Sequence, residues 1–90
     1  MKTIRIIISG KVQGVYYRQS TKEKALSLGL TGTVKNLSNG DVEATATGNQ
    51  SSLNELICWC RIGPSRAVVE NVKTEELSLI EFAGFVIVRS

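Results

Sequence analysis

The sequence LTGTVKNLSNGDVEATAT, residues 30–47, contains the clearest structural signal in this chain. The dipeptide Asn39-Gly40 separates two segments of strand-like composition, residues 30–36 and 41–47. Asn-Gly accepts the positive φ angles of a tight turn and is the strongest short hairpin signal. In the second segment three apolar residues alternate with polar ones, so one face is expected in the core and the other in water: Val42, Ala44 and Ala46. The stretch therefore predicts an antiparallel hairpin.

A strand and a helix are predicted before this hairpin. Residues 3–9 are rich in β-branched side chains, and three isoleucines share one face: Ile4, Ile6 and Ile8. From about residue 17 to residue 28 the apolar spacing becomes helical, at steps of four, four and three: Tyr17, Thr21, Ala25 and Leu28. Gly29 is placed to end this helix in the left-handed conformation.

A second helix and two more strands are predicted after the hairpin. We expect Gly48-Asn49 to end the preceding strand, and Ser51 or Ser52 to cap the helix. Its apolar stripe follows the i, i+3, i+4, i+7 pattern: Leu53, Leu56, Ile57 and Cys60. Gly63-Pro64 should stop the helix. Residues 67–77 then carry a fourth strand, and residues 85–88 a short fifth strand.

The predicted order is β-α-β-β-α-β with a short fifth strand at the C-terminus. This order gives an α+β fold of the ferredoxin-like type, with an antiparallel sheet and two helices on one face. With 90 residues and no linker, the chain is expected to form a single domain over residues 1–90. Because domains of this fold bind metals, RNA or small ligands, function must be argued from a site.

The chain has no histidine, which excludes several enzyme classes. Ser-His-Asp and Cys-His nucleophilic sites both depend on that residue. The formal net charge of +3 favours an anionic ligand but is too small for the dense Lys/Arg patch of a nucleic-acid binder. RNA binding on the open sheet face is also disfavoured, because residues 3–9 and 41–47 offer no aromatic side chain for base stacking. We expect no nucleic-acid partner.

The two cysteines, Cys58 and Cys60, fall in the second predicted helix. Two residues apart, they point about 200° apart around the helix axis, which places them poorly for bridging each other. Without a further cysteine or a histidine they cannot complete a zinc site. We expect both to stay reduced, one of them in the core, as in a cytoplasmic protein. No run approaches the roughly 20 apolar residues of a transmembrane helix, so no membrane partner is expected.

The segment from Gly10 to Arg18, GKVQGVYYR, is a candidate anion site between the first strand and the first helix. Amides that enter a helix have no intrahelical acceptor, and the helix dipole adds positive charge there. A loop with glycine can curl such amides around one anion, and the planar fork of Arg18 can hold two phosphate oxygens. The alternative is an ordinary glycine loop followed by a solvated arginine.

Asn36 closes the second predicted strand just before the turn. An asparagine in this position normally serves the turn, although Asn39, directly before Gly40, fits that role better. If Asn36 lies near the loop, its amide can orient a water for attack on a phosphoryl group. An acyl phosphate releases a carboxylate, a group with a pKa of about 4, so no general acid is required. Such a site needs no histidine, metal or reactive cysteine.

These two segments resemble the signatures of the acylphosphatase family. The first is similar to Gly-x-Val-Gln-Gly-Val-x-aromatic-Arg, with Tyr17 as the aromatic residue. The second is similar to a pattern built on glycine, valine and asparagine, in which six positions match: Gly32, Val34, Asn36, Gly40, Val42 and Gly48. The stretch from Cys60 to Pro64 also resembles the family's Gly-Pro loop. Thr33 departs from the pattern, since an aromatic residue is usual there, which puts packing in doubt more than chemistry.

The resemblance implies an acylphosphatase, which hydrolyses acyl phosphates to a carboxylate and inorganic phosphate without a cofactor or metal. Arg18 would bind the phosphate and Asn36 would hold the water. The phosphate loop would be formed by the backbone amides of five residues: Gly14, Val15, Tyr16, Tyr17 and Arg18.

Two further expectations concern how the protein acts. Acylphosphatase-like domains also occur inside larger carbamoyl-transfer maturation proteins, so a non-catalytic, anion-binding regulatory module is the alternative. A chain that starts at Met1 and stops just after the last strand favours a free-standing enzyme, and nothing suggests more than a monomer. Trp59 lies off the apolar stripe and is expected at a packing edge.

Overall fold

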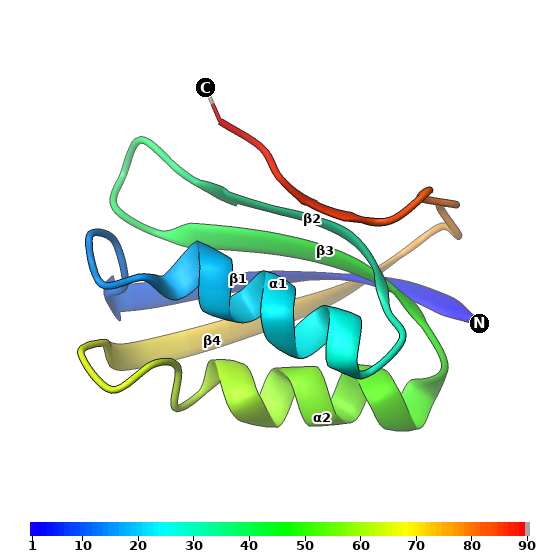
Figure 1. Ribbon diagram of the computed structural model, residues 1–90, viewed down its shortest axis with the longest axis horizontal. Coiled ribbons are helices and arrows are strands. Elements are labelled where there is room, and N and C mark those ends of the chain that lie inside the picture. Colours follow the sequence, from blue (N-terminus) through cyan, green and yellow to red (C-terminus); the bar gives the residue numbers. More distant parts are fainter. Residues whose placement is uncertain (90) are drawn as a thin grey trace.

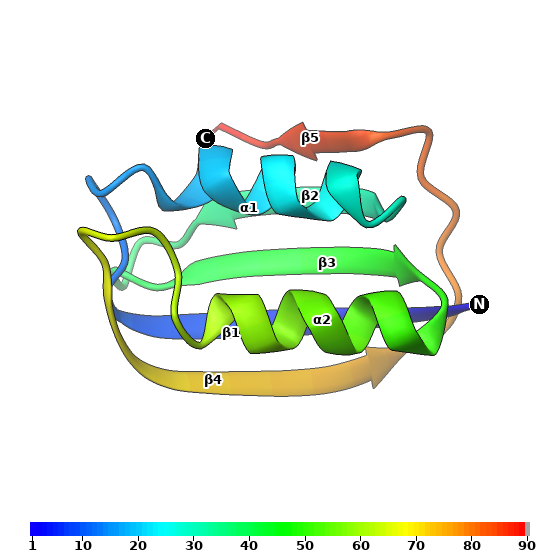
Figure 2. The same cartoon turned by 60° about the horizontal axis from the view of Figure 1, so that its bottom comes forward.

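The computed structural model describes residues 1–89, so Ser90, the last residue of the predicted domain, lies outside the described residues. Its elements are, in chain order, β1 (Lys2–Lys11), α1 (Tyr17–Ser27), β2 (Thr31–Asn36), β3 (Val42–Gly48), α2 (Gln50–Cys60), β4 (Val68–Leu77) and β5 (Phe85–Ile87). The strands form one sheet in the order β4-β1-β3-β2-β5. Both helices cover the same face, α1 over β2 and α2 over β1 (Figures 1 and 2). The predicted ferredoxin-like α+β fold is confirmed.

Four strands pair antiparallel as predicted, whereas the fifth makes the sheet mixed. β1 pairs with β3 and β4, and β2 pairs with β3, all antiparallel. β5 runs parallel to β2, with Val34 opposite Ile87. The connection from β4 to β5 crosses from one edge of the sheet to the other, at the end where the N-terminus lies (Figure 2). Parallel pairing follows from this crossing, because the chain returns to enter β5 in the direction of β2.

The hairpin forms around the Asn-Gly turn as predicted. The Leu37 amide donates to the Asp41 carbonyl oxygen at 2.8 Å and closes the turn. Within it, the Asp41 amide donates to Asn39 Oδ1 at 3.0 Å, the local bond by which asparagine stabilises turns. The structure also explains why the second motif has a glycine at position 32, in β2. Its φ is +149°, and a Cβ there would overlap the Thr45 carbonyl oxygen across the strand pair.

The core lies between the sheet and the two helices. The predicted alternation holds, because one face of β1 and one face of β3 are buried in full: Ile4, Ile6, Ile8, Val42, Ala44 and Ala46. From α2 the stripe contributes Leu53, Leu56 and Cys60, with Ile57 half-buried at its margin. Each fully buried Ile or Leu contributes on the order of 1.5–3 kcal/mol relative to an exposed side chain. Cys60 is the core cysteine, Cys58 is exposed, and both are free thiols.

Several boundaries differ from the predictions. Asn49, not Ser51 or Ser52, caps α2: its Oδ1 accepts the Ser52 amide at 2.8 Å, three residues into the helix. Because Asn49 follows β3 directly, the helix begins earlier than the serines indicated. β3 ends at Gly48, as predicted, whereas β1 continues through Gly10 to Lys11, where a loop was expected. Gly29 has the predicted positive φ, +72°, directly after the α1 C-cap at Leu28.

Within residues 1–89 the two helices are each 11 residues long, and neither is long and apolar enough to cross a membrane.

Candidate active site

The loop of residues 12–16 joins β1 to α1 and is fixed by apolar side chains. Val12 and Val15 are buried in the core, and Tyr17, the first residue of α1, is buried as expected. Between these anchors Gly14 and Tyr16 face solvent. The side chains therefore hold the loop from below while its backbone remains at the surface.

The backbone of this loop has the conformation of an anion-binding nest. Gly14 and Tyr16 have φ angles of +73° and +67°, and residues of ordinary backbone conformation lie next to them. Tyr16 caps α1 without any side-chain hydrogen bond, and the first turn of α1 contains no acidic residue. Within residues 1–89, no acceptor is assigned to the backbone N–H groups of residues 14–18. These five N–H groups, here called the amide cradle, lie at the positive end of the α1 dipole.

Tyr16 has a strained backbone conformation. Among residues 1–89 it is the only non-glycine residue with a positive φ. Its side chain is 66% exposed, so core packing does not explain the strain. Strained backbone of this kind concentrates at ligand-binding sites, where the surrounding structure over-determines it.

Tyr17 anchors the start of α1 against α2. Its hydroxyl donates to the Cys60 carbonyl oxygen at 2.7 Å, and its ring packs against Trp59 with centroids 5.5 Å apart. The half-buried Trp59 thus lies at a packing edge, as expected. Burial raises the pKa of the Tyr17 phenol, and burial also raises the pKa of the Cys60 thiol to about 12. Neither group can act as a base at neutral pH.

Gln13 connects the loop to the hairpin turn. Its Nε2 donates to the Leu37 carbonyl oxygen at 2.8 Å and to the Asp41 carbonyl oxygen at 2.9 Å. Both protons of the amide are therefore used on the turn that follows Asn36. This connection joins Gln13 and Leu37, which are 24 residues apart, and brings the two sequence motifs to the same end of the molecule.

Asn36 is the last residue of β2 and stands one residue before Leu37. Its Oδ1 is buried and, within residues 1–89, is the only buried side-chain oxygen or nitrogen without a hydrogen-bond partner. Leaving such an acceptor unpaired costs about 1–3 kcal/mol. The neighbouring Lys35 side chain points to the other face, where its Nζ lies 3.7 Å from Glu43 Oε1. Asn36 does not serve the turn, which Asn39 stabilises instead.

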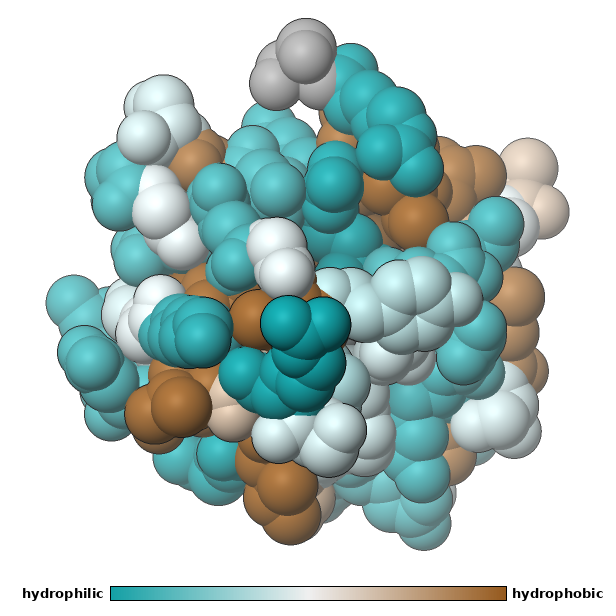
Figure 3. Space-filling model, turned by 60° about the vertical axis from the view of Figure 1, so that its left-hand side comes forward, coloured by the Kyte–Doolittle hydropathy of each residue, from teal (hydrophilic) through white to brown (hydrophobic). Residues whose placement is uncertain are grey.

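Arg18 lies in the first turn of α1 and is half-buried. Together with Tyr16 it lines a cavity of about 180 Å³ beside the amide cradle. None of the ion pairs within residues 1–89 involves Arg18. Figure 3 looks toward this end of the molecule, where hydrophilic side chains cover most of the surface.

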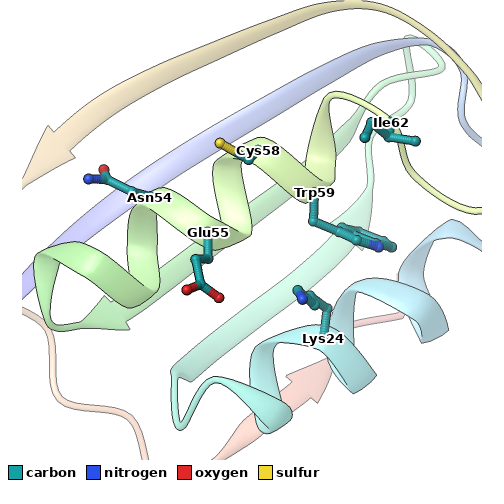
Figure 4. Close-up of a pocket in the computed structure, with 6 residues that line it drawn as sticks. All are labelled: Lys24, Asn54, Glu55, Cys58, Trp59 and Ile62. Carbon is teal, nitrogen blue, oxygen red and sulfur yellow. The ribbon is translucent and has the colours of Figure 1, made fainter.

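A larger groove lies between the two helices, away from the predicted site residues. It has a volume of about 370 Å³ and is lined by Lys24, Asn54, Glu55, Cys58, Trp59 and Ile62. Figure 4 shows it with Trp59 of α2 and Lys24 of α1 on its two sides. The groove has no unpaired buried acceptor and no free helix N-terminus, so the amide cradle is the stronger candidate site.

Comparisons with known proteins point to one family. A family model described as Acylphosphatase matches residues 4–87. The chain belongs to the acylphosphatase family. An acylphosphatase from Marinobacter nauticus is 53% identical over 81 residues, which cover 89% of this chain and 88% of the relative.

Two solved acylphosphatase structures are similar to this one over almost the whole chain. The structure from Coxiella burnetii matches with a TM-score of 0.93 and 45% identity, covering 96% of this chain and 90% of the other. The structure from Bacillus subtilis matches with a TM-score of 0.96 and 33% identity, covering 99% of this chain and all of the other. This acylphosphatase therefore hydrolyses acyl phosphates to a carboxylate and inorganic phosphate, as its resemblance implied.

The candidate site contains two features that the sequence did not reveal. Gln13 stands in the first motif, but nothing local shows that its amide reaches the turn after Asn36. Arg89 lines the cavity beside Arg18 because β5 pairs with β2. The only sequence signal for Arg89 was its place just after a short apolar strand.

Proposed function

We propose that this acylphosphatase works by in-line attack of a water held by Asn36 on a phosphoryl group bound by Arg18 and the amide cradle. The observation that carries the proposal is the unpaired, buried Oδ1 of Asn36, one residue from the turn that Gln13 ties to the loop. A buried acceptor without a partner is costly, and a substrate water would supply the missing hydrogen bond.

The amide cradle and Arg18 suit a phosphoryl group. Five N–H donors at a helix N-terminus and one guanidinium can neutralise the non-bridging oxygens. Phosphoryl transfer requires mainly positioning and charge stabilisation from the protein. Val12, Val15 and Tyr17 are buried, so these donors are held in place before the substrate arrives and need little reorganisation.

Asn36 acts on the nucleophile. Its Oδ1 accepts one hydrogen of the water, which turns an oxygen lone pair toward phosphorus. As the new P–O bond forms, the bond to the acyl oxygen breaks and the carboxylate leaves with the electron pair. The proton of the water passes to a phosphoryl oxygen, so the products are a carboxylate and hydrogen phosphate. With a carboxylate pKa of about 4, the leaving group needs no protonation.

Three further properties complete the proposal: metal independence, a monomeric state and a cytoplasmic location. No group of three metal-ligating side chains occurs within residues 1–89, and the chemistry above assigns no step to a metal.

The two free thiols suit a reducing compartment. The edge strand β4 carries exposed charged residues, which disfavour edge-to-edge pairing. Light scattering at micromolar concentration tests the monomer, since a mass near twice 9.8 kDa would contradict it.

The test is hydrolysis of benzoyl phosphate at neutral pH with a chelator present, together with inhibition by inorganic phosphate. Asn36→Ala should lower kcat by about 100-fold or more, the effect of removing one transition-state contact, and leave the phosphate inhibition constant within about threefold. Arg18→Ala should weaken both, because it contacts ground state and transition state. Asn54→Ala, which removes an exposed asparagine from α2, is the matched control and should change neither. Equal and small effects of the Asn36 and Arg18 variants would remove both residues from the mechanism.

A further inference from the structure

The amide cradle opens into a small cavity that the mechanism above does not use in full. The cavity of about 180 Å³ is lined by Tyr16, Arg18, Gln19, Ile87 and Arg89. Two of these five residues are arginines, and none is acidic. Because Tyr16 and Arg18 belong to the segment that forms the cradle, the cavity begins where the phosphoryl group would bind and extends toward Arg89.

The fold itself places Arg89 at this position. β5 pairs parallel with β2 as far as Val34 and Ile87, and the Val88 amide donates to the Val34 carbonyl oxygen at 2.9 Å. Asn36 ends β2 two residues after Val34, and Arg89 follows Ile87, the last residue of β5, by two residues. The same register, continued beyond β5, puts Arg89 level with Asn36. Side chains alternate along an extended chain, so Arg89 shares a face with Ile87, which packs against the core under α1. The guanidinium is thereby directed to the side of the sheet that carries the site.

A second guanidinium is more than a phosphoryl group requires. Arg18 and the amide cradle already supply the charge and the hydrogen bonds for three oxygens, while a simple acyl group such as acetyl or benzoyl carries no charge for Arg89. We propose that Arg89 is a specificity-determining residue, which binds a second anionic group on the acyl portion of the substrate. The preferred substrate class is then acyl phosphates whose acyl chain ends in a carboxylate or a phosphate. This inference rests on the proposed binding of the phosphoryl group at Arg18.

The size of the cavity limits the acyl chain. Pockets for drug-sized ligands measure roughly 300–1,000 Å³, and this cavity is clearly smaller. A chain of a few carbon atoms between the two anionic ends fits this volume. Tyr16 and Ile87 offer apolar contact to such a chain, and the planar fork of Arg89 suits a terminal carboxylate or phosphate equally.

A matched pair of substrates tests the inference. Succinyl phosphate and butanoyl phosphate have the same four-carbon chain, and only succinyl phosphate ends in a carboxylate; phosphoglyceroyl phosphate adds a terminal phosphate. We expect the wild-type enzyme to favour succinyl over butanoyl phosphate by about tenfold in kcat/KM, mainly through KM, the effect of one charge-assisted hydrogen bond. The preference should shrink as ionic strength rises, since the cavity is open to solvent. Comparison of the two anionic substrates shows which terminal group binds better.

Variants at residue 89 give the decisive readout. Arg89→Gln should abolish the preference and leave kcat/KM for butanoyl phosphate within about twofold, while Arg89→Lys should retain part of it. Lys73→Gln removes the same charge from β4, at the opposite edge of the sheet, and should preserve the preference. An equal loss for both substrates in Arg89→Gln would mean that Arg89 acts on the phosphoryl group, and no loss for either would mean that it binds nothing; both results overturn the inference.

Failure of the proposed mechanism would look different. In that case butanoyl phosphate, which has no second charge, would be hydrolysed with the same kcat and KM by the wild type, by Arg18→Ala and by Asn36→Ala. A preference that depends on Arg89 with an intact effect of Asn36→Ala supports both proposals.

Discussion

Tyr16 carries the strain of the loop, and its backbone rather than its phenol is what phosphate binding requires. A left-handed conformation costs an ordinary residue roughly 1–2 kcal/mol, whereas asparagine tolerates it. Its φ of +67° contributes to the curvature of the amide cradle. The choice of residue at position 16 should therefore act on anion binding through φ alone.

Comparison of Tyr16→Asn with Tyr16→Val tests this, because both variants lose the phenol. We expect Tyr16→Asn to keep the inhibition constant of inorganic phosphate within about twofold. Tyr16→Val, which is β-branched, should weaken phosphate binding by about tenfold and lower stability by about 1–2 kcal/mol. An equal weakening of phosphate binding in both variants relative to the wild type would show that the phenol, not the backbone, matters at this position.

Cys60 makes stability depend on alkaline pH. The thiol has a pKa of about 12 in the folded protein, because burial raises it from its ordinary value of 9.0. Below pH 9 the Cys60 thiol keeps its proton in both the folded and the unfolded chain, so its burial contributes fully to the free energy of unfolding. Between pH 9 and 12 the unfolded chain releases the proton while the folded protein retains it, so the free energy of unfolding falls by about 1 kcal/mol per pH unit. Above pH 12 no more is lost.

Urea unfolding at pH 8, 9 and 10 measures this fall. Cys60→Ala is the comparison, since it removes the titrating group and leaves the lysines and tyrosines that also ionise. The variant should lose less stability than the wild type between pH 9 and 10, by about 1 kcal/mol. Cys58→Ala is the matched control, because Cys58 is exposed and should behave as the wild type does. Identical slopes for wild type and Cys60→Ala would contradict the shift.

Single residues also show how far the sequence could predict the site. Arg18 and Asn36 could be singled out, because each lies at a recognisable junction between elements and each matches a motif. Their roles stay predictions, to be tested by the kinetics above. Gln13 and Arg89 could not be assigned a function from local pattern. What they do depends on which distant segments lie beside them, and the sequence does not state that.

At the scale of elements, the loop after β1 and the β2–β3 hairpin act as one unit through Gln13. The cradle amides are local to the loop, whereas Asn36 belongs to the hairpin. Two hydrogen bonds from one amide set the distance between them. A shift of about 1 Å between such groups can reduce turnover by as much as 100-fold, so this connection should affect the rate more than binding.

Gln13→Ala should lower kcat for benzoyl phosphate by about tenfold or more and change the phosphate inhibition constant less than threefold. Gln13→Glu should be worse at neutral pH, because a carboxylate would face two carbonyl oxygens. Gln50→Ala, at the start of α2, removes an exposed glutamine and serves as the control. A loss of phosphate affinity as large as the loss of kcat would mean that Gln13 shapes the cradle itself rather than the placement of Asn36.

Elements with strong periodicity were predicted well, and their ends were not. The alternation in β1 and β3 and the stripe of α2 follow from burial on one face, which the sequence records directly. The caps follow from geometry after folding. Asn49 and the serines are all good capping residues, and only the abrupt change from β3 to α2 decides that Asn49 provides the oxygen.

At the scale of the whole molecule, the crossing from β4 to β5 has a fixed anchor far from the site. Thr3 and Thr47, paired across β1 and β3, are both buried. Their hydroxyl oxygens lie 2.6 Å apart, Thr47 Oγ1 donates to the Ile80 carbonyl oxygen at 2.7 Å, and the Ile80 amide donates to Thr3 Oγ1 at 2.9 Å. With Thr3 donating to Thr47, the three groups form a closed ring. The ring holds the crossing segment against the sheet, and thereby fixes where β5 begins.

Replacement of either threonine by valine keeps the shape and breaks the ring. Thr47→Val removes the 2.7 Å donor to the Ile80 carbonyl oxygen and leaves the Thr3 hydroxyl only a longer contact, 3.4 Å, to that oxygen for its proton. The free energy of unfolding should fall by about 1–3 kcal/mol. Thr3→Val should cost a similar amount, and the double variant clearly less than the sum, because the second substitution removes a hydroxyl that has already lost its partner threonine. Thr74→Val, on the exposed part of β4, is the control and should be nearly neutral.

Urea unfolding of these four variants and the wild type gives the coupling free energy. In Figure 1 the start of β1 and the end of β3 lie at the end of the molecule opposite the loop of residues 12–16. Well below the melting temperature, kcat for benzoyl phosphate should therefore stay within about twofold in every variant. Strictly additive losses would mean that the two hydroxyls act separately. A large loss of kcat in a folded Thr47→Val would mean instead that the anchor and the site are coupled through the sheet.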